Sequence, residues 1–328
     1  MVSHESPALA PAWSTADQHR RFARYAWGLL AYTLFVILFG AVVRITGSGA
    51  GCGQHWPTCN GELLTLPQTM KTAIEYTHRA TSGLSVLGFI GLLVAAFTLY
   101  PRGHVVRGAA VLAFVMILVE ALIGAGLVVL RLVEKDASLG RIVALPLHLL
   151  STALLTAALS WCAFFSVGEA NAMRPLRPLP AGARPLLLLA ALGILIVSAT
   201  GAVTALGDTV YPAQASGLAA RLQEDQGLNA NLLQRMRGIH PFLAIGVAAF
   251  VAYVAALLPG YRATAGVKQT SLLLAVCVTL QVLAGALNVW LSAPGPLQVL
   301  HLLLANFTWI SLILLIAATR RADAPAPA

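Results

Sequence analysis

The sequence predicts an all-α integral membrane protein with eight transmembrane helices, arranged as two tandem four-helix bundles related by a pseudo-two-fold axis along the membrane normal. Three observations predict this fold: an apolar composition, eight long apolar segments and a repeat between the two halves. With 58% hydrophobic and 10% charged residues, the chain of 328 residues is too apolar for a water-soluble protein. We therefore expect membrane lipid to surround it.

Eight segments have the length of about 20 mostly apolar residues that a spanning helix needs. They are residues 27–45, 72–99, 108–131, 142–166, 185–206, 233–258, 269–291 and 297–319. The net charge of +9 does not indicate nucleic acid, because the basic residues lie at helix ends rather than in one stripe. We expect no nucleic-acid binding.

The distribution of Lys and Arg predicts that both termini face the cytoplasm of a multi-pass protein in the cell inner (plasma) membrane. Residues 1–26 contain no apolar segment with a cleavage site, which favours a cytoplasmic tail over a signal peptide. The predicted organisation is a tail, an N-terminal half, a cytoplasmic linker, a C-terminal half and a second tail. Their ranges are 1–26, 27–166, 167–184, 185–319 and 320–328.

The loop after the first segment is rich in glycine, from Thr46 to Gly61, which indicates tight turns or close backbone approach. Trp56-Pro57 and two cysteines favour an ordered cap on the outer membrane face over a flexible linker. Because the outer compartment is oxidising, we expect a disulfide between Cys52 and Cys59, with a redox-active thiol pair as the alternative. The other two cysteines lie in apolar segments and are expected to be core residues.

The second half repeats the first at nearly constant spacing. Four spans per half return the chain to the same side, so the two halves have the same orientation in the membrane. The matches are Gly40-Ala41-Val42 with Gly201-Ala202-Val203, Glu120 to Gly124 with Gln281 to Gly285, His78 with His240, and His148 with His301.

Each even-numbered segment carries one histidine about 10 Å from its outer end. Two imidazoles facing each other across a helical bundle are an arrangement that holds haem iron axially. Zinc is a weaker alternative, because a tetrahedral site needs further ligands. The remaining histidines lie in tails or loops, where we expect solvated side chains except at His55 in the capped loop. They are His4, His19, His55 and His104.

Carboxylates at membrane depth occur only in the first half. In Glu75-Tyr76-Thr77-His78-Arg79, Glu75 lies on the same helical face as His78, and Glu120 lies on the next segment. The second half has Arg237 near His240. A buried carboxylate can move protons in catalysis; the alternative for Glu75 is an ion pair with Arg79 or a cation in the loop.

These features together resemble the haem A synthase family, over about residues 27 to 319. The resemblance is carried by the loop with Cys52, Trp56-Pro57 and Cys59-Asn60-Gly61, by the Glu75 to Arg79 motif, and by the histidine in each even-numbered segment. One departure is that some members have a second cysteine pair in the loop that corresponds to residues 207–232, where this chain has none.

The resemblance implies an oxidoreductase of haem A biosynthesis and cytochrome oxidase assembly. It would convert haem O to haem A by two successive hydroxylations of a methyl group, with loss of water to give a formyl group. The implied partners are haem O and the haem O synthase that makes it, and the implied cofactor is haem b, which relays electrons. The implied roles are axial ligation of substrate haem by His78 and His148, catalysis by Glu75, and axial ligation of haem b by His240 and His301.

Arg79 and Arg237 are candidate partners for a haem propionate or another charge. Two rival functions remain at this stage. A di-haem b-type electron carrier would use the same four histidines without needing Glu75, and a transporter could use the repeat and the intramembrane charges without haem.

Overall fold

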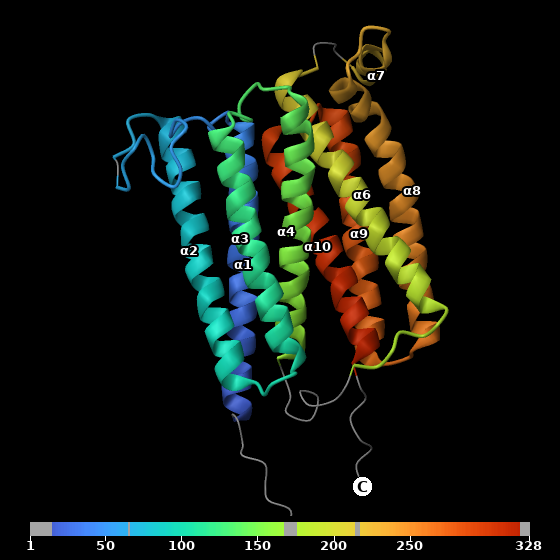
Figure 1. The fold of residues 1–328 in the computed structure, drawn as a ribbon. Helices are drawn as coiled ribbons and strands as arrows, with labels where there is room; N and C mark the ends of the chain where they lie inside the picture. Colours follow the sequence, from blue (N-terminus) through green and yellow to red (C-terminus); the bar gives the residue numbers. More distant parts are fainter. Residues whose placement is uncertain (1–14, 65, 167–175, 214–216, 322–328) are drawn as a thin grey trace, which may run out of the picture.

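A computed structural model describes residues 15–64, 66–166, 176–213 and 217–321. In these ranges it contains nine helices and no strands, and eight of the helices are long and apolar enough to cross a membrane (Figure 1). The helices are α1 (Ala16–Ile45), α2 (Met70–Leu99), α3 (Val105–Val129), α4 (Leu139–Phe165), α6 (Ala183–Val210), α7 (Leu218–Gln226), α8 (Leu232–Tyr261), α9 (Ala265–Leu291) and α10 (Gly295–Arg320).

The expected tails and linker are described only in part. Residues 1–14, 167–175 and 322–328 of these segments lie outside the described ranges. Residues 16–26 form the first turns of α1, because Thr15 and Gln18 cap the helix reciprocally: each side chain accepts from the other residue's backbone N–H.

The expectations for His19, His104 and His55 are wrong. His19 and His104 are both buried, because their rings stack on the ring of Tyr100 at centroid distances of 4.8 and 4.7 Å. His104 also caps α3, accepting at Nδ1 from the backbone N–H of Val106. His55, which was expected to be sheltered by the loop, has an exposed side chain.

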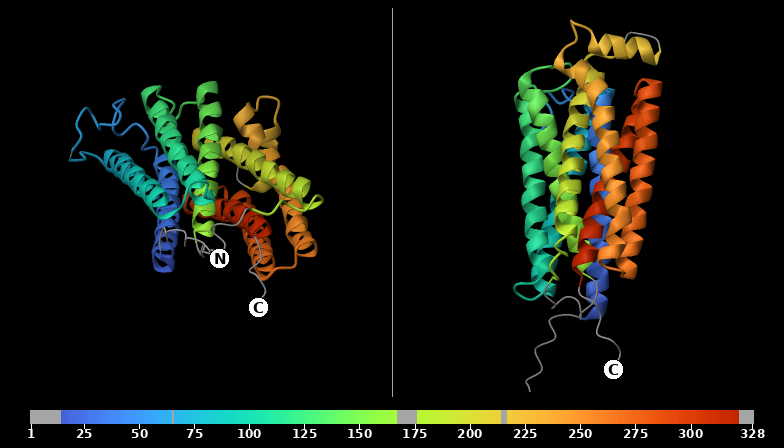
Figure 2. Two further views of the ribbon diagram at one scale, coloured as in Figure 1. Left: turned by 60° about the horizontal axis from the view of Figure 1, so that its bottom comes forward. Right: turned by 90° about the vertical axis from the view of Figure 1, so that its right-hand side faces the viewer.

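The eight long helices form two four-helix halves that lie side by side (Figures 1 and 2). The first half contains α1 to α4, and the second contains α6, α8, α9 and α10. The halves meet through α4 against α10, α4 against α6 and α1 against α10. Since α1 corresponds to α6 and α4 to α10 in the repeat, the last two pairs exchange under a two-fold rotation.

The interface between the halves is both apolar and hydrogen-bonded. Each half has its own cluster of buried apolar side chains, and α4 and α10 each contribute residues to the cluster of the other half. The indole N–H of Trp309 on α10 donates to the carbonyl oxygen of Ala153 on α4 over 2.7 Å, and both residues are buried. The packing therefore fixes α4 beside α10 along the middle of the molecule.

Arg44, in the last turn of α1, reaches into the second half. Its guanidinium donates to the carbonyl oxygen of Ala205 (2.9 Å) and the hydroxyl of Thr209 (2.7 Å) on α6, and to the side chain of Gln298 (2.8 Å) on α10. A buried guanidinium is stabilised only when its donors are paired, so these bonds tie the outer ends of the two halves together.

The first described residues of α1 and the last of α10 lie at one end of the bundle, and the loop before α2 and the short helix α7 lie at the opposite end (Figure 1). Helix α7 runs across the outer end of the second half (Figure 2, right). The sequence did not predict it, because its nine residues are mostly polar and show no long apolar stretch.

Candidate functional site

The four predicted histidines lie on four different helices, in two pairs. His78 is on α2 and His148 on α4, close enough for their charges to interact. His240 on α8 and His301 on α10 interact in the same way in the second half. All four are half-buried. Each half therefore brings two imidazoles from non-consecutive helices to the inside of its bundle.

Three of these rings rest against a glycine of a neighbouring helix. A Cβ added to Gly40 would lie 3.3 Å from Cε1 of His78, one on Gly201 would lie 3.1 Å from Cε1 of His240, and one on Gly285 would lie 3.0 Å from Cε1 of His301. These distances are shorter than ordinary carbon contacts. The repeated glycines therefore provide the room that the imidazole rings occupy.

The fourth histidine has a carboxylate partner instead. Around Gly124, which corresponds to Gly285, an added Cβ would meet no atom within 4 Å. His148 Nδ1 lies 2.8 Å from Oε2 of Glu120, with its N–H turned off the line of an ideal hydrogen bond. The hydroxyls of Ser151 and Thr152 donate to Oε1 of the same carboxylate, the second over 3.0 Å.

The second half has neutral partners at the corresponding places. The amide Nε2 of Gln281, which replaces Glu120, lies 3.3 Å from Nε2 of His301. Nδ1 of His240 lies 3.0 Å from the hydroxyl of Thr200. The residue that corresponds to Thr200 in the first half is Phe39, whose ring meets His78 edge-on at 5.7 Å.

Glu75 is buried and holds the outer loop of the first half. Its carboxylate accepts from the backbone N–H of Cys52 over 2.8 Å and from Nη2 of Arg79 over 2.5 Å. Arg79 also donates to the carbonyl oxygens of His55 and Thr58. The ion pair that was the alternative for Glu75 is therefore present, and both carboxylate oxygens contact a partner.

The predicted disulfide between Cys52 and Cys59 is present in this loop. Both cysteines are buried, and Cys52 supplies the N–H that Glu75 accepts. The two cysteines of the apolar segments, Cys162 and Cys277, are free and buried, as expected for core residues. The ordered cap is thus joined to the α2 helix one turn before His78.

Arg237 occupies the position of Glu75 in the second half. It also binds the segment outside the bundle, but it does so as a cation. Its guanidinium donates to Asp225 of α7 from Nε (3.0 Å) and Nη2 (2.5 Å), and to the carbonyl oxygen of Tyr211. Each half therefore fastens its outer segment to the turn that precedes its first histidine. Sequence reasoning found Arg237 but missed Asp225, because it did not predict α7.

The residues present fit a haem in each half. In each half two imidazoles reach the same bundle from two different helices, α2 and α4 or α8 and α10. A paired imidazole set suits a haem, whose porphyrin supplies the other four iron ligands. Within the described ranges no three or more His, Cys, Asp and Glu side chains gather as a free metal ion would need.

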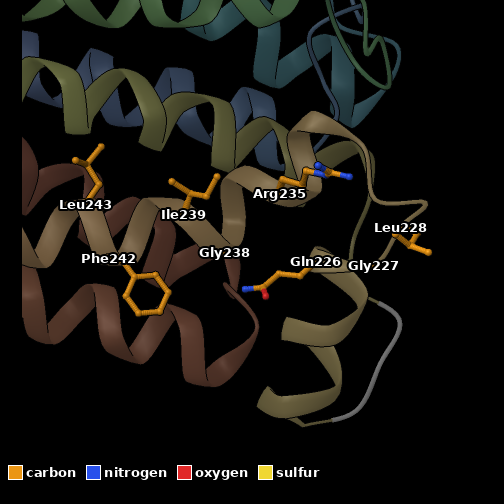
Figure 3. A pocket seen from close by; sticks show the side chains of 8 residues that line it. All are labelled: Gln226, Gly227, Leu228, Arg235, Gly238, Ile239, Phe242 and Leu243. Atoms are coloured by element: carbon orange, nitrogen blue, oxygen red, sulfur yellow. The ribbon is translucent and has the colours of Figure 1, made fainter.

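A separate groove lies where α7 turns into α8 (Figure 3). None of the four paired histidines lines it, so it is distinct from the candidate site. Its lining residues are Gln226, Gly227, Leu228, Arg235, Gly238, Ile239, Phe242 and Leu243.

Known proteins resemble this chain over most of its length. The family model COX15-CtaA, cytochrome oxidase assembly protein, matches residues 23–313. A Thermus thermophilus protein named Protoheme IX farnesyltransferase is 41% identical over 306 residues, which are 93% of this chain and 48% of that protein. The chain thus spans about half the length of this relative.

Two shorter matches have a different name. A protein named Heme A synthase from Exiguobacterium is 35% identical over 121 residues, covering 37% of this chain and 40% of that protein. Another Heme A synthase, from Bacillus mycoides, is 38% identical over 111 residues, covering 34% of this chain and 36% of that protein.

Proposed function

Because the chain belongs to the COX15-CtaA family of cytochrome oxidase assembly proteins, we propose that it is a haem A synthase. It is a multi-pass membrane oxidoreductase that oxidises a methyl group of haem O to a formyl group by two successive hydroxylations. The observation that carries this proposal is the pair of matched imidazole sites: among the described residues, a carboxylate contacts a ring of the first pair, and an amide contacts a ring of the second.

In this proposal the two halves divide the work. His78 and His148 hold the substrate haem, while His240 and His301 hold a haem b. A haem bound in each half would supply the electron transfer. The packing of α4 against α10 keeps the two halves in register.

Glu75 is the proposed catalytic acid–base of the first half. Oxidation of a methyl group to an aldehyde releases protons, and Glu75 can accept a proton at Oε1 or Oε2. Its contacts with Cys52 and Arg79 hold the carboxylate in one place, three residues from His78. Arg79 and Arg237 already bind Glu75 and Asp225, which favours a charge-partner role over contact with a haem propionate.

The name of the Thermus relative, Protoheme IX farnesyltransferase, supports the proposal that this chain acts after an enzyme that farnesylates protohaem. Haem O is the farnesylated form of protohaem, so an enzyme that transfers a farnesyl group to protohaem must act before this one. This chain matches the COX15-CtaA family model and spans 48% of the Thermus protein. We therefore assign farnesyl transfer to a partner, the haem O synthase, and oxidation to this chain.

The test is co-expression with a source of haem O, followed by extraction and chromatography of the haems. Haem A, or its hydroxylated intermediate, is the expected product. Haem b alone, with all four histidines intact, would favour the di-haem electron carrier. A preparation without any haem would favour the transporter.

The proposed orientation in the plasma membrane places both termini in the cytoplasm. It also places the Cys52–Cys59 disulfide and α7 on the outer side, where a disulfide persists. Labelling of a single cysteine introduced into the outer loop, by a reagent that cannot cross the membrane, tests this orientation in whole cells.

A further inference from the structure

Glu120 is held in the first half by a set of contacts that the second half does not have. Its carboxylate is largely buried, with 12% of the side chain exposed. Ser151 and Thr152, which donate to it, are one turn beyond His148 on α4. The residues at their positions in the second half are Leu304 and Ala305, which have no side-chain donor.

The position of Glu120 itself is also specific. Its repeat counterpart, Gln281, has nearly the same shape but no charge, and its amide lies 3.3 Å from Nε2 of His301, whereas Glu120 lies beside Nδ1 of His148. The first half therefore has a carboxylate and two hydroxyl donors where the second has an amide and two apolar residues. If these side chains only filled space, the amide and the two apolar residues would serve as well in the first half. The carboxylate and its two donors therefore indicate a role for the charge.

A carboxylate beside the outer nitrogen of an iron-bound imidazole has two physical effects. It restricts the ring orientation, because Nδ1 is held beside the carboxylate, at 2.8 Å in His148, and Nε2 is left for the iron. It also adds negative charge near the iron and makes the imidazole a stronger electron donor, which stabilises the oxidised iron. An amide gives the ring a neutral partner instead.

We propose that Glu120 is a positioning residue that fixes His148 as an iron ligand and lowers the reduction potential of the haem in the first half relative to one with an amide partner. Because this role needs a haem on His148, it rests on the proposed function. The charged Glu120 and the neutral Gln281 then contribute to different potentials for the two imidazole pairs.

The test uses the full chain with His240 and His301 both replaced by Ala, so that only the first half binds haem. The purified protein is loaded with protohaem, and the midpoint potential is measured by optical redox titration. In Glu120→Gln the potential should become more positive, and haem affinity should fall about ten- to a hundredfold. The conservative variant Glu120→Asp should keep the potential closer to that of the parent.

Two further variants serve as the mirror image and the control. With His78 and His148 replaced by Ala, Gln281→Glu should shift the remaining haem to a more negative potential. Glu62→Gln removes an exposed carboxylate of the outer loop and should change neither the potential nor the affinity.

Unchanged potential and affinity in Glu120→Gln would overturn this role and leave the proposed function standing. If Glu120→Asp shifts the potential as far as Glu120→Gln does, the effect of charge is overturned. If the first half binds no haem even with Glu120 intact, both this role and the proposed function are overturned.

Discussion

Replacement of Glu75 by Gln separates the two tasks that the structure gives to this residue. Glu75 and Arg79 form an ion pair with only 4% and 12% of their side chains exposed. Breaking a buried pair on one side costs about 3–5 kcal/mol. Arg79 keeps its bonds to the carbonyl oxygens of His55 and Thr58, so we expect the lower end, about 3 kcal/mol.

This cost should appear as local opening of the outer loop. A change of about 3 kcal/mol raises the open population roughly a hundredfold, so the Cys52 amide, which donates to Glu75, should exchange its hydrogen faster by that factor. Haem binding should persist, because the histidine contacts are untouched. Haem A output should fall on the order of a hundredfold or more, since Gln cannot take up a proton.

The matched control is Arg79→Gln, which breaks the same pair but leaves the carboxylate. It should speed exchange at Cys52 by at least the same factor, because it also removes the bonds to His55 and Thr58, while keeping most of the haem A output. Near-normal haem A output from Glu75→Gln would show that Glu75 is purely structural. Equal loss of activity in the two variants would mean that loosening of the loop, and not loss of the carboxylate, is responsible.

Three further predictions concern the second half, the disulfide and the glycines. His301→Ala should remove the low-spin haem b spectrum while haem still binds to the first half; an unchanged spectrum would contradict the ligand assignment. Cys52 and Cys59 should resist alkylation until reductant is added, and two free thiols without reductant would exclude the bridge. Replacing both with Ser should lower the free energy of unfolding by about 2 kcal/mol. Gly201→Ala should lower haem b content, because the new Cβ would lie 3.1 Å from the ring of His240. The control Gly124→Ala, whose Cβ would meet no atom within 4 Å, should bind haem normally. Equal haem content in the two variants would refute the steric argument.

The eight long helices could be predicted from the sequence, because each depends only on the apolar residues within its own segment. A run of about 20 apolar residues must form a helix in lipid, since every backbone polar group has to be paired inside the segment. The beginning of α1 at Ala16 and the short helix α7 depend on capping and on contacts with polar residues, which hydropathy does not contain. The helix ends were therefore less accurate than the spans.

The sequence located the candidate site residues but not their contacts. The repeat identified the four histidines and Glu120, and the depth of each histidine followed from the helical rise. The ring of His148 turned out to face Glu120, and the ring of His78 to rest on Gly40; these contacts join helices that only the folded chain brings together. Sequence patterns record which faces are apolar, but not which side chains meet across a bundle.

The burial of His19 and His104 shows the same limit. Each lies in a segment that reads as a tail or a loop, where a polar ring is normally solvated. Tyr100, at the end of α2, stacks with both rings, and it lies 81 residues from His19 in the chain (100 − 19). No local pattern around His19 indicates so distant a partner, whereas His104 follows Tyr100 closely in the chain and is buried because α2 packs beside both α1 and α3.

The bonds of Arg44 bear on how such a molecule can descend from a duplicated ancestor. Arg44 donates to the carbonyl oxygen of Ala205, which is its own counterpart in the other half, so the two positions face each other near the rotation axis. Two identical first halves assembled in this way would bring two guanidinium groups together, with mutual repulsion in a medium of low dielectric constant. Alanine at position 205 avoids that repulsion, and its backbone carbonyl accepts from Arg44. The Arg44 contact therefore favours pairing of a first half with a second half over pairing of two first halves.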